Sequence, residues 1–356
     1  MSKDGTVFLT GFPGFIASRL LRHLAREGGR YFLLVQPDFV TRANSELKAI
    51  ASESGKTLSD FVVIEGDITR PDLGMSPPDL EMTLAETTII FSLAAVYDLG
   101  VVREVGMNVN VHGTRNMNQF ARSLQQLEHY HYISTCYVAG KRTGVIYENE
   151  LRHQAGFRNH YEETKYLAEV EVDTLKGELP ITIHRPSVVC GDSQTGETVK
   201  YDGIYYLIRY LLKWPWLLST FNIGNDDVSL NLVPVDFVVE ALSALSREPG
   251  AIGKTIQLAD PNPLTTRLLF NQIARTLAGR EASITLPAAM VEKSLMLPPS
   301  PRLTGLPHTG VPYFFLKQTY DTANATQLLE PYGIRCPPFP SYVRNIVDYA
   351  ANHPAL

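Results

Sequence analysis

Two residues with complementary chemistry, Tyr161 and Lys165, lie four positions apart in a stretch with helical periodicity. Side chains at this spacing share one face of a helix, so the phenol and the ammonium can face one site. A free tyrosine titrates near about pH 10, and a neighbouring cation lowers that pKa because it favours the phenolate. The pair therefore predicts proton transfer at a substrate oxygen, although an isolated pair of this kind is most often a solvated helix face.

A glycine-rich turn separates the first predicted strand of the chain from the first predicted helix. Residues 6–10 read as a short buried strand, and residues 18–26 have helical periodicity. Gly11 would make the tight turn, and Gly14 would let a pyrophosphate approach the backbone at the helix N-terminus, where N–H groups favour an anion. A plain turn between a strand and a helix is the alternative. The turn predicts a dinucleotide site with loop contacts at Gly11, Phe12, Gly14, Phe15 and Ile16.

The second predicted strand bears on the choice of cofactor. It ends at Gln36, where an acid would bind the ribose hydroxyls of NAD, and Arg42 follows as a partner for a 2′-phosphate. We therefore expect NADP, with NAD as the alternative. Asp67 and Ile68, after the third strand, are predicted to face the adenine ring, although Asp67 could equally be a turn former.

Strands alternate with helices through most of the chain, which predicts an α/β fold with a doubly wound parallel Rossmann sheet of about seven strands. Ligands bind at the carboxyl ends of such strands, where Leu93, Ala94, Ala95 and Thr135 fall. After about residue 190 this rhythm changes, which predicts a smaller, mostly helical substrate region. The predicted dinucleotide-binding domain comprises residues 1–186 and 231–260, and the substrate region comprises residues 187–230 and 261–356.

Composition excludes several classes of protein. The 356 residues carry a net charge of −5, with 44% hydrophobic and 19% charged residues, which gives no reason to expect nucleic acid binding. Three cysteines without close pairing predict a reducing compartment, and nine histidines show no metal-ligand spacing, so we expect no metal. The N-terminus has no secretory leader, and no apolar run reaches the roughly eighteen residues of a spanning helix. A cytoplasmic protein is expected.

The order and spacing of seven motifs resemble the extended short-chain dehydrogenase/reductase superfamily. Within it, the chain most resembles the thioester reductase and fatty acyl-CoA reductase branch, the male sterility-type NAD-binding proteins. Residues 66–76, 94–114 and 133–151, together with Thr135 where other branches have serine, carry this second resemblance. The seven motifs are TGFPGFIA (10–17), GDI (66–68), SLAA (92–95), NVHGT (110–114), ISTCYVAG (133–140), YEETK (161–165) and HRPSVVCG (184–191).

The resemblance implies a role for each candidate site residue. Tyr161 would be the general acid/base, Lys165 would hold the nicotinamide ribose and lower the pKa of Tyr161, and Thr135 would hydrogen-bond the substrate oxygen. Asn110 would support a proton relay or a helix bend, unless it is merely a helix N-terminal residue. Cys136 adjoins the site and is expected to be a buried structural thiol. The residues expected to border the nicotinamide are Pro186, Ser187 and Val188.

The expected function is reduction of a carbonyl by an NAD(P)-dependent oxidoreductase. The expected substrate is an acyl thioester or the derived aldehyde, hydrophobic and bound to CoA or to a carrier protein. The alternatives are a ketone or alcohol oxidoreductase on a bulky polyketide-, sterol- or flavonoid-like molecule, a sugar-nucleotide epimerase or dehydratase, and a non-enzymatic NADP-sensing scaffold. The aromatic-rich residues 201–218 would form a pocket wall, ordinary core or the face of a homodimer.

Overall fold

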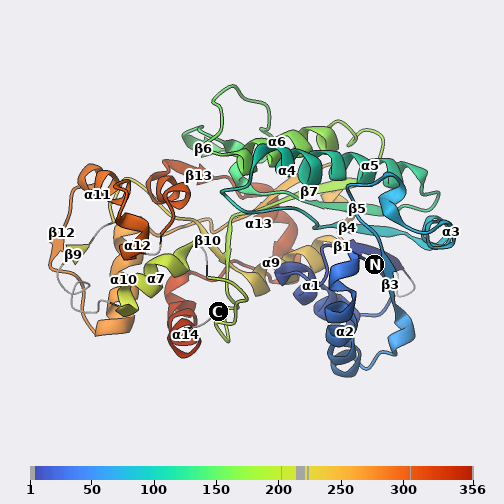
Figure 1. Ribbon diagram of the computed structural model, residues 1–356, viewed down its shortest axis with the longest axis horizontal. Coiled ribbons are helices and arrows are strands. Elements are labelled where there is room, and N and C mark those ends of the chain that lie inside the picture. The colour runs from blue at the N-terminus through green and yellow to red at the C-terminus, as the bar shows by residue number, and fades with distance from the viewer. Residues whose placement is uncertain (1–4, 202, 214–220, 223, 305, 355–356) are drawn as a thin grey trace.

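A seven-stranded parallel sheet forms the centre of the computed structural model, which describes residues 5–201, 203–213, 221–222, 224–304 and 306–354. The strands lie in the order β11-β7-β5-β4-β1-β2-β3 (Figure 1). They are short and rich in β-branched and aromatic residues, as expected for strands that are buried on both faces. Their bounds are β1 (Thr6–Thr10), β2 (Arg30–Val35), β3 (Phe61–Glu65), β4 (Ile89–Ser92), β5 (His129–Ile133), β7 (Ile181–Pro186) and β11 (Thr255–Leu258).

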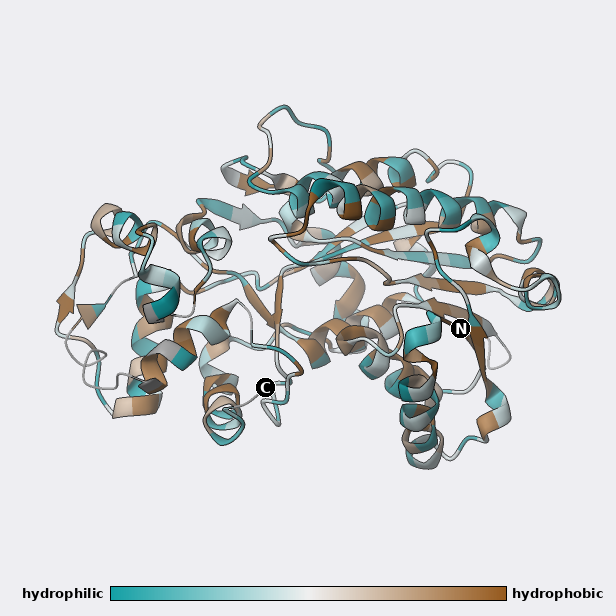
Figure 2. Cartoon of the chain, viewed as in Figure 1, coloured by the Kyte–Doolittle hydropathy of each residue, from teal (hydrophilic) through white to brown (hydrophobic). Residues whose placement is uncertain are grey.

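Helices cover both faces of this sheet, which confirms the predicted doubly wound α/β fold. Figure 2 shows hydrophobic strands between helices whose outer surfaces are largely hydrophilic. Apolar side chains on both faces of the sheet pack against the helices and form the two main cores. One layer contains α1 (Phe15–Ala25), α2 (Val40–Ser54) and α9 (Val235–Leu245). The other contains α3 (Pro77–Glu86), α4 (Arg103–Gly106), the π-helical segment η4 (Met107–His112), α5 (Gly113–Ser123) and α6 (His160–Asp173).

The strand order reverses at β1, because β2 and β3 extend the sheet on one side and β4 extends it on the other. Connections that leave adjacent strands in opposite directions open a crevice at their carboxyl ends. The hydroxyl of Thr10, the last residue of β1, accepts hydrogen bonds from the backbone N–H groups of Leu93 and Ala94 at 3.1 and 3.0 Å. These bonds fix the chain after β4 beside the glycine-rich turn.

A second group of elements lies beside the sheet, on the left in Figure 1. Its core joins aromatic residues such as Tyr205, Phe270 and Tyr342 with aliphatic side chains. Its helices are α7 (Ile204–Lys213), α10 (Thr266–Ala278), α11 (Ala288–Leu295), α12 (Ser300–Thr304) and α14 (Phe339–Asn352). Three two-stranded pairs complete it or join it to the sheet: β8 (Val188–Cys190) with β10 (Leu232–Pro234), β9 (Phe221–Asn222) with β12 (Ile284–Thr285), and β6 (Gly144–Ile146) with β13 (Gln318–Tyr320).

Two observations bear on the predicted regions. β11 joins the main sheet, as the assignment of residues 231–260 to the first domain requires. The helix α13 (Ala323–Leu329), from the predicted substrate region, also packs through Ala325 and Leu329 into the core that contains α1, α2 and α9. The division into two domains itself stays a prediction. In the aromatic-rich stretch, Tyr205 and Ile208 are buried core residues, and residues 214–218 lie outside the described part of the chain. No helix among the described residues is long and apolar enough to cross a membrane.

Candidate active site

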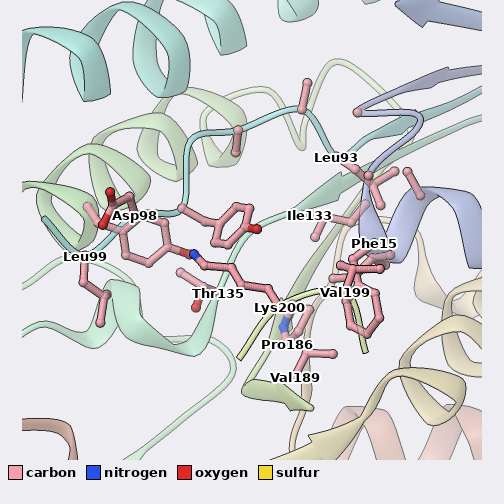
Figure 3. Close-up of a pocket in the computed structure, with 18 of the residues that line it drawn as sticks. Phe15, Leu93, Asp98, Leu99, Ile133, Thr135, Pro186, Val189, Val199 and Lys200 are labelled. Carbon is pink, nitrogen blue, oxygen red and sulfur yellow. The ribbon is translucent and has the colours of Figure 1, made fainter. Parts of the chain in front are cut away.

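A cavity of about 650 Å³ lies at the carboxyl ends of the sheet strands and extends toward the second group of elements. Figure 3 shows Phe15, Leu93 and Ile133 toward one end and Asp98 and Leu99 toward the other. All predicted cofactor residues outside α6 line this cavity: Gly11, Phe12, Gly14, Phe15, Ile16, Gln36, Arg42, Asp67, Ile68, Leu93, Ala94, Ala95, Pro186, Ser187 and Val188. Thr135 and Tyr161 also line it, whereas Lys165 and Asn110 lie behind its wall.

The glycine-rich turn is shaped as a phosphate-binding loop requires. Gly11 has a φ of +88°, and a Cβ there would lie 3.0 Å from the backbone nitrogen of Ala94. A Cβ on Gly14 would lie only 2.6 Å from the carbonyl oxygen of Gly11. Gly14 precedes α1, whose first residues line the cavity and whose N-terminus has no side-chain cap. The loop therefore fits a dinucleotide pyrophosphate, which would accept hydrogen bonds from the first N–H groups of α1.

The end of β2 is joined to the end of β3 by a side-chain hydrogen bond. Gln36 Nε2 donates to Asp67 Oδ2 at 3.1 Å, and Asp67 Oδ1 accepts from the amide and the hydroxyl of Thr69, both at 2.8 Å. Partial burial opposes ionisation of Asp67, but these donors outweigh it and lower its pKa. Asp67 thus remains a carboxylate at the cavity edge. The exposed guanidinium of Arg42 lines the same end.

Two consecutive hydroxyl residues after β5 have different surroundings. Thr135 Oγ1 accepts a hydrogen bond from the backbone N–H of Tyr137 at 3.2 Å and keeps its own proton for donation toward the cavity. The Ser134 hydroxyl donates to the buried carboxylate of Glu169. Cys136 is also buried, with Sγ 3.1 Å from the carbonyl oxygen of Arg185, and burial raises the pKa of its thiol. These contacts support a structural role for Ser134 and agree with the structural thiol expected at Cys136.

Lys165 lies one turn after Tyr161 on α6, as the spacing predicts. Its Nζ donates to the carbonyl oxygen of Ile133, the last residue of β5, at 2.9 Å, and lies 3.5 Å from the hydroxyl of Tyr132. The side chain is buried, and burial lowers the pKa of Lys165 to about 8, while the carboxylate of Glu169 opposes that shift. The carbonyl oxygen at the end of β5, two residues before Thr135, therefore holds the ammonium.

Glu169 and Arg185 form a buried ion pair next to Ser134. Glu169 Oε1 accepts hydrogen bonds from Nε and Nη2 of Arg185 at 2.9 and 2.6 Å, and both side chains are at most 1% exposed. Nη1 of Arg185 donates to the carbonyl oxygen of Glu150 at 3.1 Å. Because Glu169 also accepts from Ser134 and lies one turn after Lys165, this ion pair fixes β5, β7 and α6 relative to one another.

Asn110 is buried inside the π-helical segment η4. Its Oδ1 accepts from the backbone N–H of Val96 at 2.9 Å, and its Nδ2 donates to the carbonyl oxygen of Val96 at 3.1 Å and to the hydroxyl of Thr164 at 3.0 Å. It therefore connects the loop after β4 to the helix of Tyr161. This geometry fits a positioning role beside a helix irregularity, and the predicted proton relay stays a prediction.

The substrate side of the cavity contains residues that sequence reasoning did not identify. Tyr137 lies two residues after Thr135, a position that could have been suspected from the ISTCYVAG motif. Lys200 extends across the cavity in Figure 3, and its Nζ lies 4.8 Å from the ring centre of Tyr97. The C-terminal residues of the wall carry no recognisable motif. They are Leu306, Pro307, Thr309, Gly310, Tyr313 and Phe314.

Comparisons with known proteins agree with this site. Residues 9–242, more than half of the chain, match the family model described as male sterility protein, an NAD-binding domain. Fatty acyl-CoA reductase wat of Drosophila melanogaster is 26% identical over 279 residues, which cover 68% of this chain and 54% of that protein. The non-canonical nonribosomal peptide synthetase FrzA of Cladobotryum sp is 24% identical, with 94% of this chain and 35% of the synthetase covered. The chain thus spans about half the length of the first relative and about a third of the second.

Solved structures show the same fold. The terminal R domain from the myxalamid PKS-NRPS biosynthetic pathway has a TM-score of 0.83 and 24% identity, with 99% of this chain and 92% of that chain covered. The reductase domain of a nonribosomal peptide synthetase from Mycobacterium tuberculosis has a TM-score of 0.73 and 18% identity, with 99% and 93% covered. The predicted superfamily and branch are confirmed. The chain belongs to the male sterility protein family of NAD-binding domains.

Proposed function

We propose that this chain is an NADPH-dependent reductase of acyl thioesters, or of the aldehydes derived from them. The observation that carries the proposal is that Thr135 and Tyr161 line one cavity that continues from the glycine-rich loop into a largely apolar wall. The names of the relatives, a fatty acyl-CoA reductase and the reductase domains of synthetases, support the same substrate class. A CoA- or carrier-protein-bound substrate belongs to this proposal.

The chain's own residues would hold the cofactor through the loop contacts and the strand ends. The pyrophosphate fits the N-terminus of α1, where a Cβ on Gly14 would clash with the carbonyl oxygen of Gly11 and distort the loop. Gln36 replaces the acid that favours NAD, and Arg42 lines the same end of the cavity, so we assign NADP rather than NAD. When bound, the reduced nicotinamide would supply the hydride.

Thr135 and Tyr161 would stabilise the substrate oxygen as charge develops on it. As the hydride adds to the carbonyl carbon of a thioester, the carbonyl π electrons move to the oxygen, and the Tyr161 phenol gives that oxygen its proton. The Thr135 hydroxyl donates a second hydrogen bond. The charge of Lys165, held by the carbonyl oxygen at the end of β5, would favour the phenolate that Tyr161 leaves.

The product of this step is a hemithioacetal. Breakage of its C–S bond, with loss of the hydroxyl proton and protonation of the leaving sulfur, gives an aldehyde and a thiol. A second hydride and proton would convert the aldehyde into the alcohol. The apolar wall, which includes Leu230, Leu306 and Phe314, would hold the acyl chain and exclude water from the reacting carbon.

The proposal is tested by measuring oxidation of NADPH and NADH with four substrates: a long-chain acyl-CoA, the matched aldehyde, a hydrophobic ketone and a UDP-sugar. Thiol release that accompanies NADPH loss with the acyl-CoA is the expected result. Turnover of the ketone alone would replace the proposal with the alcohol dehydrogenase alternative, and conversion of the UDP-sugar without net oxidation would favour an epimerase. NADH oxidation equal to that of NADPH would contradict the assignment to Gln36 and Arg42.

A further inference from the structure

The C-terminal part of the cavity wall is attached to the helix that carries Tyr161. This wall segment, defined as residues 306–314, includes most of the 3-10 helical element η7 (His308–Phe315). It lies more than 130 residues after the end of α6 in the sequence, and neither β-sheet pairing nor a disulfide joins the two. Contacts of the Tyr313 side chain connect them.

The Tyr313 hydroxyl is held by a donor and an acceptor. It donates to Oε1 of Glu162 at 2.7 Å and accepts from Nδ2 of Asn159 at 2.8 Å. The residue is only 4% exposed, so these bonds do not compete with bulk water. A buried phenol with both hydrogen-bonding capacities used has one defined position.

Both partners of Tyr313 belong to the start of α6. Asn159 is the N-cap residue, whose Oδ1 accepts from the backbone N–H of Glu162 at 3.0 Å. Glu162 is fully buried and also accepts from the backbone N–H of Arg158 at 2.9 Å and from its guanidinium at 3.2 Å. Glu162 directly follows Tyr161, so the anchor of the wall segment is one residue from the proposed acid.

A second contact connects the wall segment to Thr135. The ring centres of Tyr313 and Tyr137 are 4.4 Å apart. Tyr137 in turn donates its backbone N–H to Thr135 Oγ1. Tyr313 thus contacts Glu162, which follows Tyr161, and Tyr137, which lies two residues after Thr135.

We propose that Tyr313 is a positioning residue, whose hydroxyl fixes the wall segment to the first turn of α6 and so sets the distance between the acyl-binding wall and Tyr161. The hydrogen bonds of Tyr313 therefore set the width of the cavity before the substrate binds. That an acyl group occupies the cavity rests on the function proposed above. The attachment of the wall segment to α6 does not rest on it.

The test compares Tyr313→Phe with Tyr320→Phe. The first substitution removes the hydroxyl and keeps the ring that packs on Tyr137. The second removes the hydroxyl of a similarly buried tyrosine in the same C-terminal region, which donates to Gln318 Oε1 at 3.0 Å. Tyr320 does not line the cavity. Hydrogen–deuterium exchange of residues 306–315 is measured for both variants and the parent chain, followed by kinetics with long- and short-chain acyl-CoA.

In Tyr313→Phe, exchange across residues 306–315 should increase by about tenfold, because this segment loses its anchor. KM for the acyl substrate should rise by about tenfold, the preference between long and short chains should narrow, and NADPH affinity should stay within about twofold of the parent. Tyr320→Phe should change neither exchange in this segment nor KM.

Unchanged exchange in Tyr313→Phe, or the same KM increase in Tyr320→Phe, would overturn the proposal. If the parent chain reduced no thioester, the kinetics would count against the proposed function, while the exchange measurement would still decide whether Tyr313 anchors the wall segment.

Discussion

Replacing Glu169 with glutamine should lower the free energy of unfolding and the pKa of Lys165, because the buried carboxylate of Glu169 is lost. The Arg185 guanidinium makes two hydrogen bonds to Glu169 at 2.6 and 2.9 Å, and both side chains are at most 1% exposed. Removing one partner of a buried ion pair costs about 3–5 kcal/mol, because the other charge remains buried and unpaired. Glutamine keeps the volume and one acceptor, so we expect a loss of about 3 kcal/mol, the lower end of that range.

This loss is large for a protein whose stability is of the order of 5–15 kcal/mol. With a urea m-value of about 3 kcal/mol/M, the unfolding midpoint of Glu169→Gln should fall by about 1 M while m stays constant. Glu169 also opposes the lowering of the pKa of Lys165. The variant should therefore lose the charge of Lys165 at a lower pH than the parent chain.

Glu171→Gln on the same helix is the matched control. Glu171 pairs with Arg115 in a partly exposed ion pair, whose side chains are 35% and 51% exposed. Such surface pairs contribute about 0–1 kcal/mol, so the midpoint should move by no more than about 0.3 M. An equal shift for Glu169→Gln and Glu171→Gln would refute the reasoning that the buried pair fixes β5, β7 and α6.

Three further predictions concern the loop, the lysine and two buried histidines of the sheet, His129 in β5 and His184 in β7. Gly14→Ala should weaken NADPH binding in fluorescence titration by about tenfold or more, because the alanine Cβ would lie 2.6 Å from the carbonyl oxygen of Gly11. Unchanged affinity would exclude the loop as the pyrophosphate site. Acyl-CoA turnover should decline as pH rises through about 8, where Lys165 loses its proton, and a profile that is flat to pH 9.5 would contradict this role. Burial lowers the pKa of His129 to about 4 and that of His184 to about 3. Below about pH 6.5 the unfolded chain therefore binds more protons than the folded chain, and the free energy of unfolding in urea should fall as the pH falls toward 5. His184→Gln should reduce this dependence of stability on pH, and an unchanged dependence would contradict the contribution of His184.

The sequence predicts most of the cofactor side of the site because that side is built from local rules. A glycine turn between a strand and a helix, and small or polar residues just after strands, meet at one edge of any parallel sheet. Gly11, Gly14 and Asp67 therefore come together as predicted, and Tyr161 and Lys165 share a helix because their spacing requires it.

The substrate side depends on long-range contacts that no local rule specifies. The bond between Tyr313 and Glu162 joins residues 151 positions apart, and the two residues belong to elements that sequence periodicity treats independently. The attachment of Asn110 to Val96 likewise depends on the π-helical segment η4, for which the resemblance implied only a helix bend. The bond from Lys165 to Ile133 depends on how closely α6 packs on β5.

The most direct test of the proposed function follows thiol release and NADPH oxidation together, in the parent chain and in Tyr161→Phe, with a long-chain acyl-CoA. One thiol should appear for each NADPH oxidised when the product is an aldehyde, and one thiol for each two NADPH when the product is an alcohol. Tyr161→Phe should lower kcat by about 10²–10⁴-fold and leave NADPH affinity unchanged. NADPH oxidation without thiol release, or a Tyr161→Phe variant as active as the parent, would contradict the proposed function.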